Sequence, residues 1–286
     1  MIRKARALVG HMARDQALQV IQGGAAAQPG TDVSRSLSEW EQIRRHVAAR
    51  QPIEIEDPTI ELPSSYARRV GEFTNRADVQ QTFAPLDWSV VAIDLSKPIL
   101  TYQTLVHTDD AVQRVSAVDI EDPDALFDAC LPEAERVELP GGFDPSQNAF
   151  TISSLNPNLR IASFEVVETP LPQGLTKRIV GFSLSLGGSH VQICEYRNRW
   201  MIRDGYHRLY GLMERGATIV PCVLIKARSF EETGAGRPGF FGFEILYSDR
   251  PPLLSDFHDP RFSLEVTTPA VRKVVRVRAE EFVVPV

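Results

Sequence analysis

The chain has 286 residues, of which 43% are hydrophobic and 24% are charged, and its formal net charge is −6 at pH 7. This composition is typical of a globular protein with a buried core and excludes a wholly disordered chain. The excess of acidic residues argues against a protein that coats nucleic acid without regard to sequence, because that function needs a broad excess of Lys and Arg.

The first half of the chain is predicted to be largely helical. Residues 3–22 have a helical composition, and residues 23–30, rich in Gly, Ala and Gln, indicate a linker, so that residues 1–35 are expected to form a flexible segment. Ser36 and Ser38 compete as the N-cap of the next helix, because each has a Glu three residues later, and Pro52 closes that helix.

Residues 36–145 are expected to form a helical region that contains one or two strands. The β-rich run Trp88–Leu95, extended by Ile99–Val106, carries the strand signal, and Ile53–Glu56 is a weaker one. A turn is predicted at Pro140-Gly141-Gly142. Further short helices are predicted at Ser65–Glu72, Asn75–Phe83 and Asp122–Cys130.

From Ala149 onward the pattern changes to short strands that are separated by turns. The strands are expected at Phe150–Ser153, Leu159–Glu168, Arg178–Leu186 and His190–Tyr196, and the turns at Asn156-Pro157, Gln173-Gly174 and Gly187-Gly188. A last strand, Val271–Arg278, carries Arg272, Arg276 and Arg278, a pattern that favours an edge strand protected by charge.

The clearest pattern in the chain is a strand at Arg199–Arg203, a helix at Gly205–Arg215 that Gly216 ends, and a strand at Ile219–Ala227. If the two strands are parallel in one sheet, they should form a right-handed crossover. The sequence therefore predicts an α+β fold, in which residues 146–286 form a small mixed-sheet domain around a strand–turn–helix–strand motif.

The turn of this motif, Asp204-Gly205-Tyr206-His207-Arg208, predicts an anion site. Gly205 permits a backbone conformation that a Cβ would block. The first N–H groups of a helix lack intrahelical partners and lie at the positive end of its dipole. His207 and Arg208 would oppose that dipole by roughly 0.3–1 kcal/mol per charge unless an anion is bound. Arg208 could grip a phosphate with its planar donors, and Asp204 could cap the helix and orient the basic side chains.

The run from Arg199 to Tyr210, followed by Glu214-Arg215-Gly216 and Val220-Pro221-Cys222-Val223, resembles the ParB/sulfiredoxin superfamily. The pattern of that family is a strand, a D-G-x-H/R-R turn, a helix, a glycine and a V-P strand. The resemblance implies a small α+β domain whose turn binds nucleotide phosphates. It also implies ATP or CTP as the cofactor, with Mg²⁺ brought in by the nucleotide.

The resemblance does not select one activity, because the family includes CTP-dependent DNA clamps, ATP-using sulfinic-acid reductases and a free-serine kinase. Tyr206 stands where a sulfiredoxin has its catalytic cysteine, and His207 stands where a chromosome-partitioning ParB has Arg. The D-G-H-H-R motif of the serine kinase is the closest. A kinase needs a carboxylate base, for which Glu165, Glu168 and Glu195 are only candidates.

We therefore expect a cytoplasmic nucleotide-binding protein, with phosphotransferase or NTP hydrolase activity as its enzymatic form. The alternatives are a non-catalytic regulatory or scaffold protein that retains the fold, and a ParB-like nuclease or DNA-binding protein, which the acidic net charge does not favour. A small anionic ligand is the expected partner, and a homodimer is left open. The phosphate-binding residues are expected to be Gly205, Tyr206, His207, Arg208 and Arg203, and the catalytic residues Asp204 and His207.

Other candidates have plainer explanations. His107-Thr108-Asp109-Asp110 and Asp256-Phe257-His258-Asp259 contain metal-ligand residue types, but a turn or helix cap rich in Asp is favoured for both. Tyr210 is expected to pack rather than to stack on a base. The glycine-rich segment Thr233–Gly242 is expected to be a mobile loop that connects its neighbours rather than a lid over a ligand.

No apolar run approaches the roughly 20 residues that span a bilayer, so no membrane partner is expected. His11 and Arg14 interrupt the N-terminal segment before a signal core develops. Cys130, Cys194 and Cys222 lie far apart, which argues against a disulfide framework or a zinc site and favours a reducing compartment.

Overall fold

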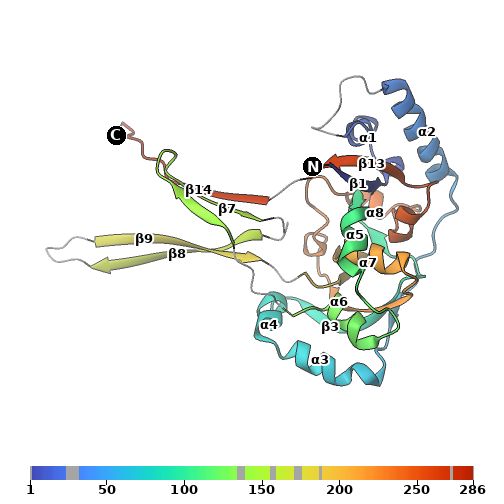
Figure 1. Cartoon of the computed structure of the whole chain (residues 1–286), viewed down its shortest axis with the longest axis horizontal. Coiled ribbons are helices and arrows are strands. Elements are labelled where there is room, and N and C mark those ends of the chain that lie inside the picture. The colour runs from blue at the N-terminus through green and yellow to red at the C-terminus, as the bar shows by residue number, and fades with distance from the viewer. Residues whose placement is uncertain are drawn as a thin grey trace. The chain divides into compact units, whose positions relative to one another are not determined.

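The computed structural model describes residues 2–23, 32–133, 139–154, 159–170, 176–186, 189–270 and 273–285. The described residues combine helices and strands in a mixed α+β fold, as predicted (Figure 1). The chain divides into two compact units. Unit 1 comprises Met1–Glu133 and Ser189–Ala270, and unit 2 comprises Ala134–Gly188 and Val271–Val286. Unit 2 is therefore an insertion that the C-terminal residues complete, whereas the sequence patterns placed the boundaries at residues 35 and 145.

Unit 1 contains a six-stranded mixed sheet with the order β2-β3-β12-β10-β11-β4. Its central strand β12 (Ile219–Lys226) is buried along almost its whole length, which explains its continuous apolar sequence. The other strands are β2 (Thr59–Ile60), β3 (Asp87–Asp94), β4 (Leu100–Thr101), β10 (Gln192–Tyr196) and β11 (Arg199–Asp204).

Helix α7 (Tyr206–Glu214) joins β11 to β12, as predicted, but the two strands are not parallel. Strand β10 lies between them, antiparallel to β11 and parallel to β12. Strands β11 and β12 therefore run in opposite directions, and the condition for a right-handed crossover is not met.

A second sheet of unit 1 is antiparallel and has the order β13-β1-β5. Its members are β1 (Ile2–Ala7), β5 (Leu105–His107) and β13 (Leu264–Pro269). The prediction of a helix from residue 3 in a flexible segment is wrong for β1, where Ala5 and Ala7 are buried at every second position, the period of a strand. A helix follows only at α1 (Arg14–Ile21), and residues 24–31, most of the predicted linker, lie outside the described residues.

The helix predicted from Ser36 or Ser38 begins earlier, as α2 (Val33–Ala49), because Asp32 is its N-cap. The Asp32 carboxylate accepts hydrogen bonds from the main-chain N–H groups of Ser34 and Arg35. Three further helices lie where they were predicted, whereas Ile53–Glu56 forms no strand and α5 had no predicted counterpart. The three predicted helices are α3 (Ala67–Thr74), α4 (Ala77–Phe83) and α6 (Pro123–Cys130), and the unpredicted helix α5 is Thr108–Val115.

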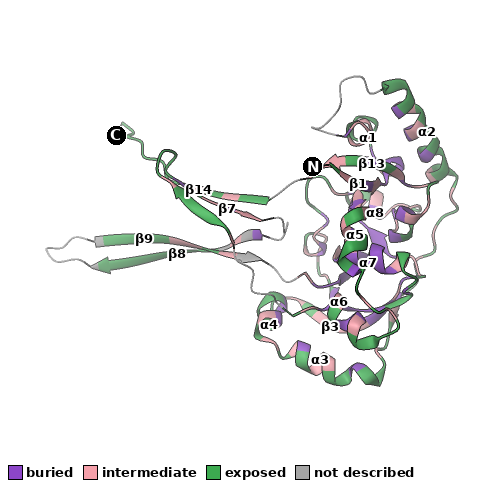
Figure 2. Ribbon diagram, viewed as in Figure 1, coloured by how far each residue is buried: buried purple, intermediate pink, exposed green. Residues whose placement is uncertain are grey.

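Helix α7 belongs to the core of unit 1. Figure 2 shows buried residues on α7, whereas α2 and α3 are exposed over much of their surface. Five consecutive residues of α7 are buried, from Arg208 to Leu212. Because the helix that begins at the predicted anion turn is packed on most sides, the turn itself is held in a fixed position.

Helices α5 and α7 lie side by side and run in the same direction (Figure 1). Their contacts advance in step, with His107 against His207, Ala111 against Gly211, and Val115 accepting a hydrogen bond from Arg215. A Cβ built on Gly211 would overlap the carbonyl oxygen of Ala111 and lie 2.8 Å from Val115 Cγ2. The absence of a side chain at residue 211 therefore sets how closely the two helices approach.

Unit 2 consists of a three-stranded antiparallel sheet, order β14-β7-β6, and the hairpin β8-β9. Strand β14 is at an edge, as its arginines predicted, whereas the turn predicted at Gly141-Gly142 is wrong because both glycines belong to β6. The predicted turns at 156–157, 173–174 and 187–188 lie outside the described residues. The strands are β6 (Gly141–Asp144), β7 (Ala149–Ser154), β8 (Leu159–Pro170), β9 (Thr176–Leu186) and β14 (Lys273–Arg278).

Among all these elements, none of the helices in the described part of the chain has both the length and the apolar character needed to cross a membrane.

Candidate functional site

The chain reverses at Gly205, between the end of β11 and the start of α7. Gly205 is the N-cap of α7 and has φ +83° and ψ 11°, a left-handed conformation that L-residues rarely adopt. A Cβ on this residue would lie 2.9 Å from Cα of Val191. Asp204 Oδ1 accepts a hydrogen bond of 2.7 Å from the Gly205 N–H. The turn thus requires glycine both for its conformation and for its close contact with Val191.

The main-chain N–H groups of Tyr206, His207 and Arg208 precede the first hydrogen bond of α7, which runs from Leu209 N to Gly205 O at 3.0 Å. Within the described residues these three groups have no hydrogen-bond partner, and the first turn of the helix contains no acidic residue. They lie at the positive end of the helix dipole, where an anion is favoured.

A second helix begins beside this turn. His107 is the N-cap of α5, and its ring stacks on that of His207 with centroids 5.7 Å apart and an interplanar angle of 5°. Because α5 and α7 are parallel, their positive ends lie together. At α5 this potential is offset by two acids of the first turn, since Asp109 accepts a hydrogen bond from Lys4 N and Asp110 pairs with Arg3. The corresponding turn of α7 has no such acid.

His207 is a neutral hydrogen-bond donor rather than a base. Its Nε2 accepts a hydrogen bond of 3.1 Å from the His107 N–H, so the proton of the neutral ring is on Nδ1. Burial, and then the positive charges of His107 and Arg114, lower the pKa of His207 to about 3. The ring can therefore offer Nδ1–H to an anion, as expected of a phosphate ligand, whereas Nε2 is occupied within the protein.

This lowered pKa predicts a loss of stability in acid. The unfolded chain takes up a proton near the ordinary histidine pKa of 6.5, whereas the folded chain takes it up only near pH 3, so stability is lost as the pH falls from 6.5 toward 3. In His207→Gln, where an amide oxygen can replace Nε2 as the acceptor, we expect the fall in the free energy of unfolding between pH 7 and pH 5 to shrink by about 2 kcal/mol.

Denaturant unfolding at a series of pH values measures this difference. The part of the loss that remains should come from His11 and His190, whose pKa values burial lowers to about 3 and about 4, and from His107, whose pKa burial also lowers. An identical pH dependence in the wild type and in His207→Gln would show that His207 titrates normally in the folded protein.

Arg208 does not point its guanidinium toward a ligand. The side chain is buried, and Nη1 donates hydrogen bonds to the carbonyl oxygens of Ala129 (2.9 Å) and Cys130 (3.3 Å). Nη2 donates to the carbonyl oxygen and the hydroxyl of Ser189. Two of these acceptors are at the C-terminal end of α6, where a cation also interacts favourably with the helix dipole. The phosphate-binding role predicted for the Arg208 side chain is therefore replaced by an internal one.

The partners of Arg208 adjoin both ends of the 134–188 insertion. Ala129 and Cys130 lie just before unit 2 begins, and Ser189 is the first residue after it. A hydrogen bond of 2.8 Å from Val191 N to Cys130 O joins the same two chain segments. Arg208 thus ties the predicted anion turn to the point where the chain leaves and re-enters unit 1.

Arg203, the other predicted phosphate ligand, is also engaged. Its Nη1 donates to Gln192 Oε1 at 2.8 Å, and its carbonyl oxygen accepts a hydrogen bond of 2.6 Å from the Tyr102 hydroxyl. The predicted loop Thr233–Gly242 packs beside it, because Phe241 is buried and donates its N–H to Tyr102 O at 2.8 Å. The loop therefore supports the end of β11.

The two tyrosines of α7 lie in different surroundings. Tyr206 is half-buried, with its ring 4.2 Å from that of His207. Tyr210 is buried and stacks on His258 at 4.2 Å, which confirms the prediction that it packs. His258 in turn lies 2.7 Å from Glu214 through Nδ1. Only Tyr206 lies at the turn itself.

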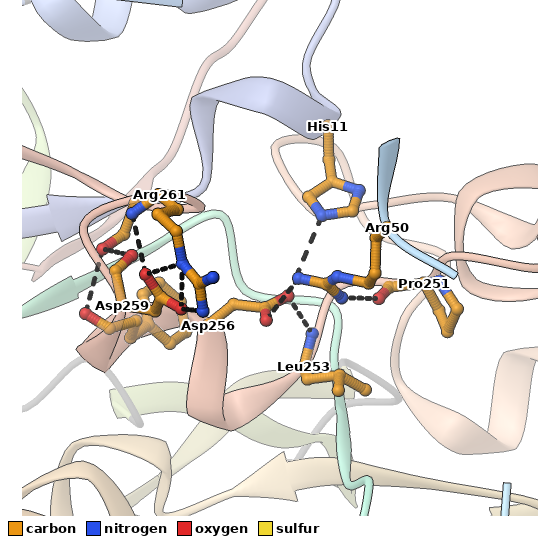
Figure 3. A network of polar contacts seen from close by, with 9 residues as sticks. His11, Arg50, Pro251, Leu253, Asp256, Asp259 and Arg261 are labelled. Carbon is orange, nitrogen blue, oxygen red and sulfur yellow. Dashed lines mark hydrogen bonds and ion pairs between the residues drawn. The ribbon is translucent and has the colours of Figure 1, made fainter. Parts of the chain in front are cut away.

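The two segments with metal-ligand residue types serve as helix starts and ion pairs. Figure 3 shows Asp256 between Arg50 and His11, with Oδ1 2.5 Å from Arg50 Nη2 and Oδ2 3.9 Å from His11 Nε2. Oδ2 also accepts a hydrogen bond of 2.9 Å from Leu253 N. In the described part of the chain, no three His, Cys, Asp or Glu side chains are grouped so that they could hold a metal ion.

None of the three glutamates considered as a base is placed at the turn. Glu195 accepts a hydrogen bond from Asn198 N at the other end of β11. Glu165 and Glu168 are on β8 in unit 2, where Glu168 pairs with Arg178. Sequence reasoning missed Arg114, which is exposed in the last turn of α5 and has no ion-pair partner among the described residues. The apolar spacing of Ala111 and Val115 after two acids could have indicated α5.

Models of protein families, curated proteins and solved structures were compared with this chain, and none of them matched it.

Proposed function

We propose that unit 1 binds the phosphate groups of a nucleotide at the start of α7. The proposal depends above all on one observation: behind a left-handed Gly205, three consecutive main-chain N–H groups have no partner among the described residues. The neighbouring start of α5 and the Nδ1–H of His207 add positive potential and a further donor at the same point.

In this proposal the residues of the motif have roles that differ from those that the sequence alone predicts. The main chain of residues 206–208 and the His207 ring contact the phosphates, whereas Arg208 holds the turn in place from behind. Arg114 acts at longer range, because its charge already influences His207 and Tyr206. The resemblance of the motif to the ParB/sulfiredoxin superfamily points to the same ligand, ATP or CTP accompanied by Mg²⁺.

The occupied side chains favour binding over catalysis. His207 Nε2 and the Arg208 guanidinium are both engaged within the protein, and neither can act on a substrate without losing those bonds. The preferred form of the proposal is therefore a nucleotide-binding regulatory protein. Phosphotransfer or hydrolysis, if added to binding, would depend on positioning and on Asp204, the only carboxylate of the motif.

A thermal-shift series with ATP, CTP, GTP, ADP and pyrophosphate, each with and without Mg²⁺, tests this proposal. A nucleotide present at a hundred times its Kd should raise the free energy of unfolding by about 2.7 kcal/mol. We expect the nucleoside triphosphates to raise the unfolding temperature, and pyrophosphate to raise it less. If none of these compounds changes the unfolding temperature, the proposal is wrong.

A charge-reversal pair locates the site. Arg114→Glu should weaken nucleotide binding roughly fivefold at low salt, because the charge of residue 114 acts on His207 and Tyr206 at the turn, and this effect should be screened as salt is added. Arg45→Glu is the matched control, because it makes the same change of charge at an exposed position on α2. Equal affinities for the two variants would place the nucleotide somewhere other than at the start of α7.

A further inference from the structure

The β8-β9 hairpin of unit 2 has one apolar face. Side chains that lie opposite each other on the two strands include the pairs Phe164–Phe182 and Val166–Val180. Farther toward the tip, the same face ends in the Glu168–Arg178 ion pair. We call this surface the apolar face of the hairpin, and its described members are Leu159, Ile161, Phe164, Val166, Val180, Phe182 and Leu184.

Unit 2 covers only the base of this face. Leu159 is fully buried, and the Phe182 ring lies 6.2 Å from that of Phe150 on β7. Beyond that contact the side chains of Phe164, Val166 and Val180 are exposed by 65%, 59% and 66%. The covering layer thus ends partway along the hairpin, and the outer half of its apolar face is exposed.

An exposed apolar surface of this kind is energetically unfavourable for a monomer in water. A two-stranded hairpin is marginally stable by itself in water and needs a further layer on its hydrophobic face. Contiguous exposed apolar patches of several hundred Å² are rare on monomers and mark interaction sites. The exposed half of this hairpin therefore calls for a partner that supplies an apolar surface.

We propose that the partner is a second copy of this chain, whose hairpin packs its own apolar face against the first around a two-fold axis. Among its described residues the face carries one pair of charges, Glu168 and Arg178, which neutralise each other. Two copies therefore meet without repulsion between like charges, whereas a nucleic acid or a strongly charged peptide would find no complementary charge on this face. An apolar and neutral surface can face a copy of itself, as the two-fold interface of a dimer requires.

The area that two hairpins can bury against each other limits the affinity of this dimer. The exposed parts of the three outer side chains, together with the flanking backbone and the ion-pair stems, amount to roughly 500 Å² per copy, or about 1,000 Å² in total. This is at the lower limit for specific protein interfaces. The dimer should therefore be reversible, with a dissociation constant in the micromolar range.

Analytical ultracentrifugation of the full-length protein, from about 1 to 100 µM, tests the proposal against that expected range of dissociation constants. The sedimentation coefficient should rise with concentration from that of a monomer to that of a dimer. A monomer at every concentration would overturn the proposal. Growth into assemblies larger than a dimer would also overturn it, because it would indicate open edge-to-edge pairing of strands rather than a closed two-fold contact.

Two double variants identify the face. Val166→Thr with Val180→Thr makes the apolar face more polar and keeps β-branched side chains, so the hairpin retains its strand propensity. Val167→Thr with Ile179→Thr makes the same kind of change at the adjacent cross-strand pair, which is also exposed but lies on the opposite face. The first variant should weaken dimerisation at least tenfold, and the second should leave it unchanged. Equal weakening by both, or weakening only by the second, would contradict a contact through the apolar face.

Discussion

Replacing Gly211 with alanine is expected to destabilise unit 1 by about 3 kcal/mol, although alanine is the better helix former by about 1 kcal/mol. The added methyl group would meet the main chain of Ala111 and, at 2.8 Å, the Val115 side chain. Neither neighbour can move alone, because both belong to α5, and α5 is packed against β1 as well. The two helices would have to separate, which would open the core around α7.

Gly71→Ala is the control for this prediction. Gly71 is in the interior of α3, and a Cβ there would meet nothing within 4 Å. The same substitution should therefore stabilise the protein by up to about 1 kcal/mol through helix propensity and a less flexible unfolded chain. Denaturant unfolding gives both values. A Gly211→Ala variant as stable as the wild type, or more stable, would show that α5 and α7 do not meet at Gly211.

Replacing Arg208 with methionine should lower the free energy of unfolding by about 3 kcal/mol. The variant keeps most of the side-chain volume but leaves the carbonyl oxygens of Ala129 and Ser189 and the Ser189 hydroxyl without this donor, and each such group costs on the order of 1 kcal/mol. Cys130 O also loses its bond to Arg208 but keeps the one from Val191 N. Hydrogen exchange should also increase around those three residues, because they lose the guanidinium that joins them.

Arg203→Met separates this effect from a general need for arginine in the motif. Arg203 is half-buried and its guanidinium donates to one side chain, Gln192, so its loss should cost at most about 1 kcal/mol. A variant Arg208→Met with nearly wild-type stability but no nucleotide binding would reverse our assignment. Arg208 would then be a ligand to phosphate, as the motif alone suggested, and not an internal support.

The motif itself was well predicted because its signals are local. Gly205 and Gly216 mark the two ends of α7, and the apolar run after Gly216 indicates a buried strand. Both glycines have positive φ values in the structure, +83° and +90°. The left-handed turn and the unpartnered N–H groups that follow from it could therefore be read from consecutive residues.

The rest of the site depends on residues that are distant in the sequence. The acceptors of Arg208 are mainly carbonyl oxygens, which every residue type carries, so no side-chain pattern could have revealed them. The stacking of His107 on His207 required α5, which is short and was not predicted. The sequence also did not reveal that unit 2 is an insertion, because the pattern of short strands continues past residue 188, where the chain returns to unit 1.

The pairing of β1 with β13 has a consequence for biosynthesis. Ile2 lies opposite Pro269, and in unit 2 β7 pairs with β14, which begins at Lys273. Each unit thus takes a strand from residues 264–278, so neither the β13-β1-β5 sheet nor the β14-β7-β6 sheet can be completed on the ribosome until those residues have emerged. Contacts between such distant residues also slow folding, because a long loop must close before they form. Nascent chains of this protein should therefore remain open to chaperones until residues 264–278 have emerged from the ribosome.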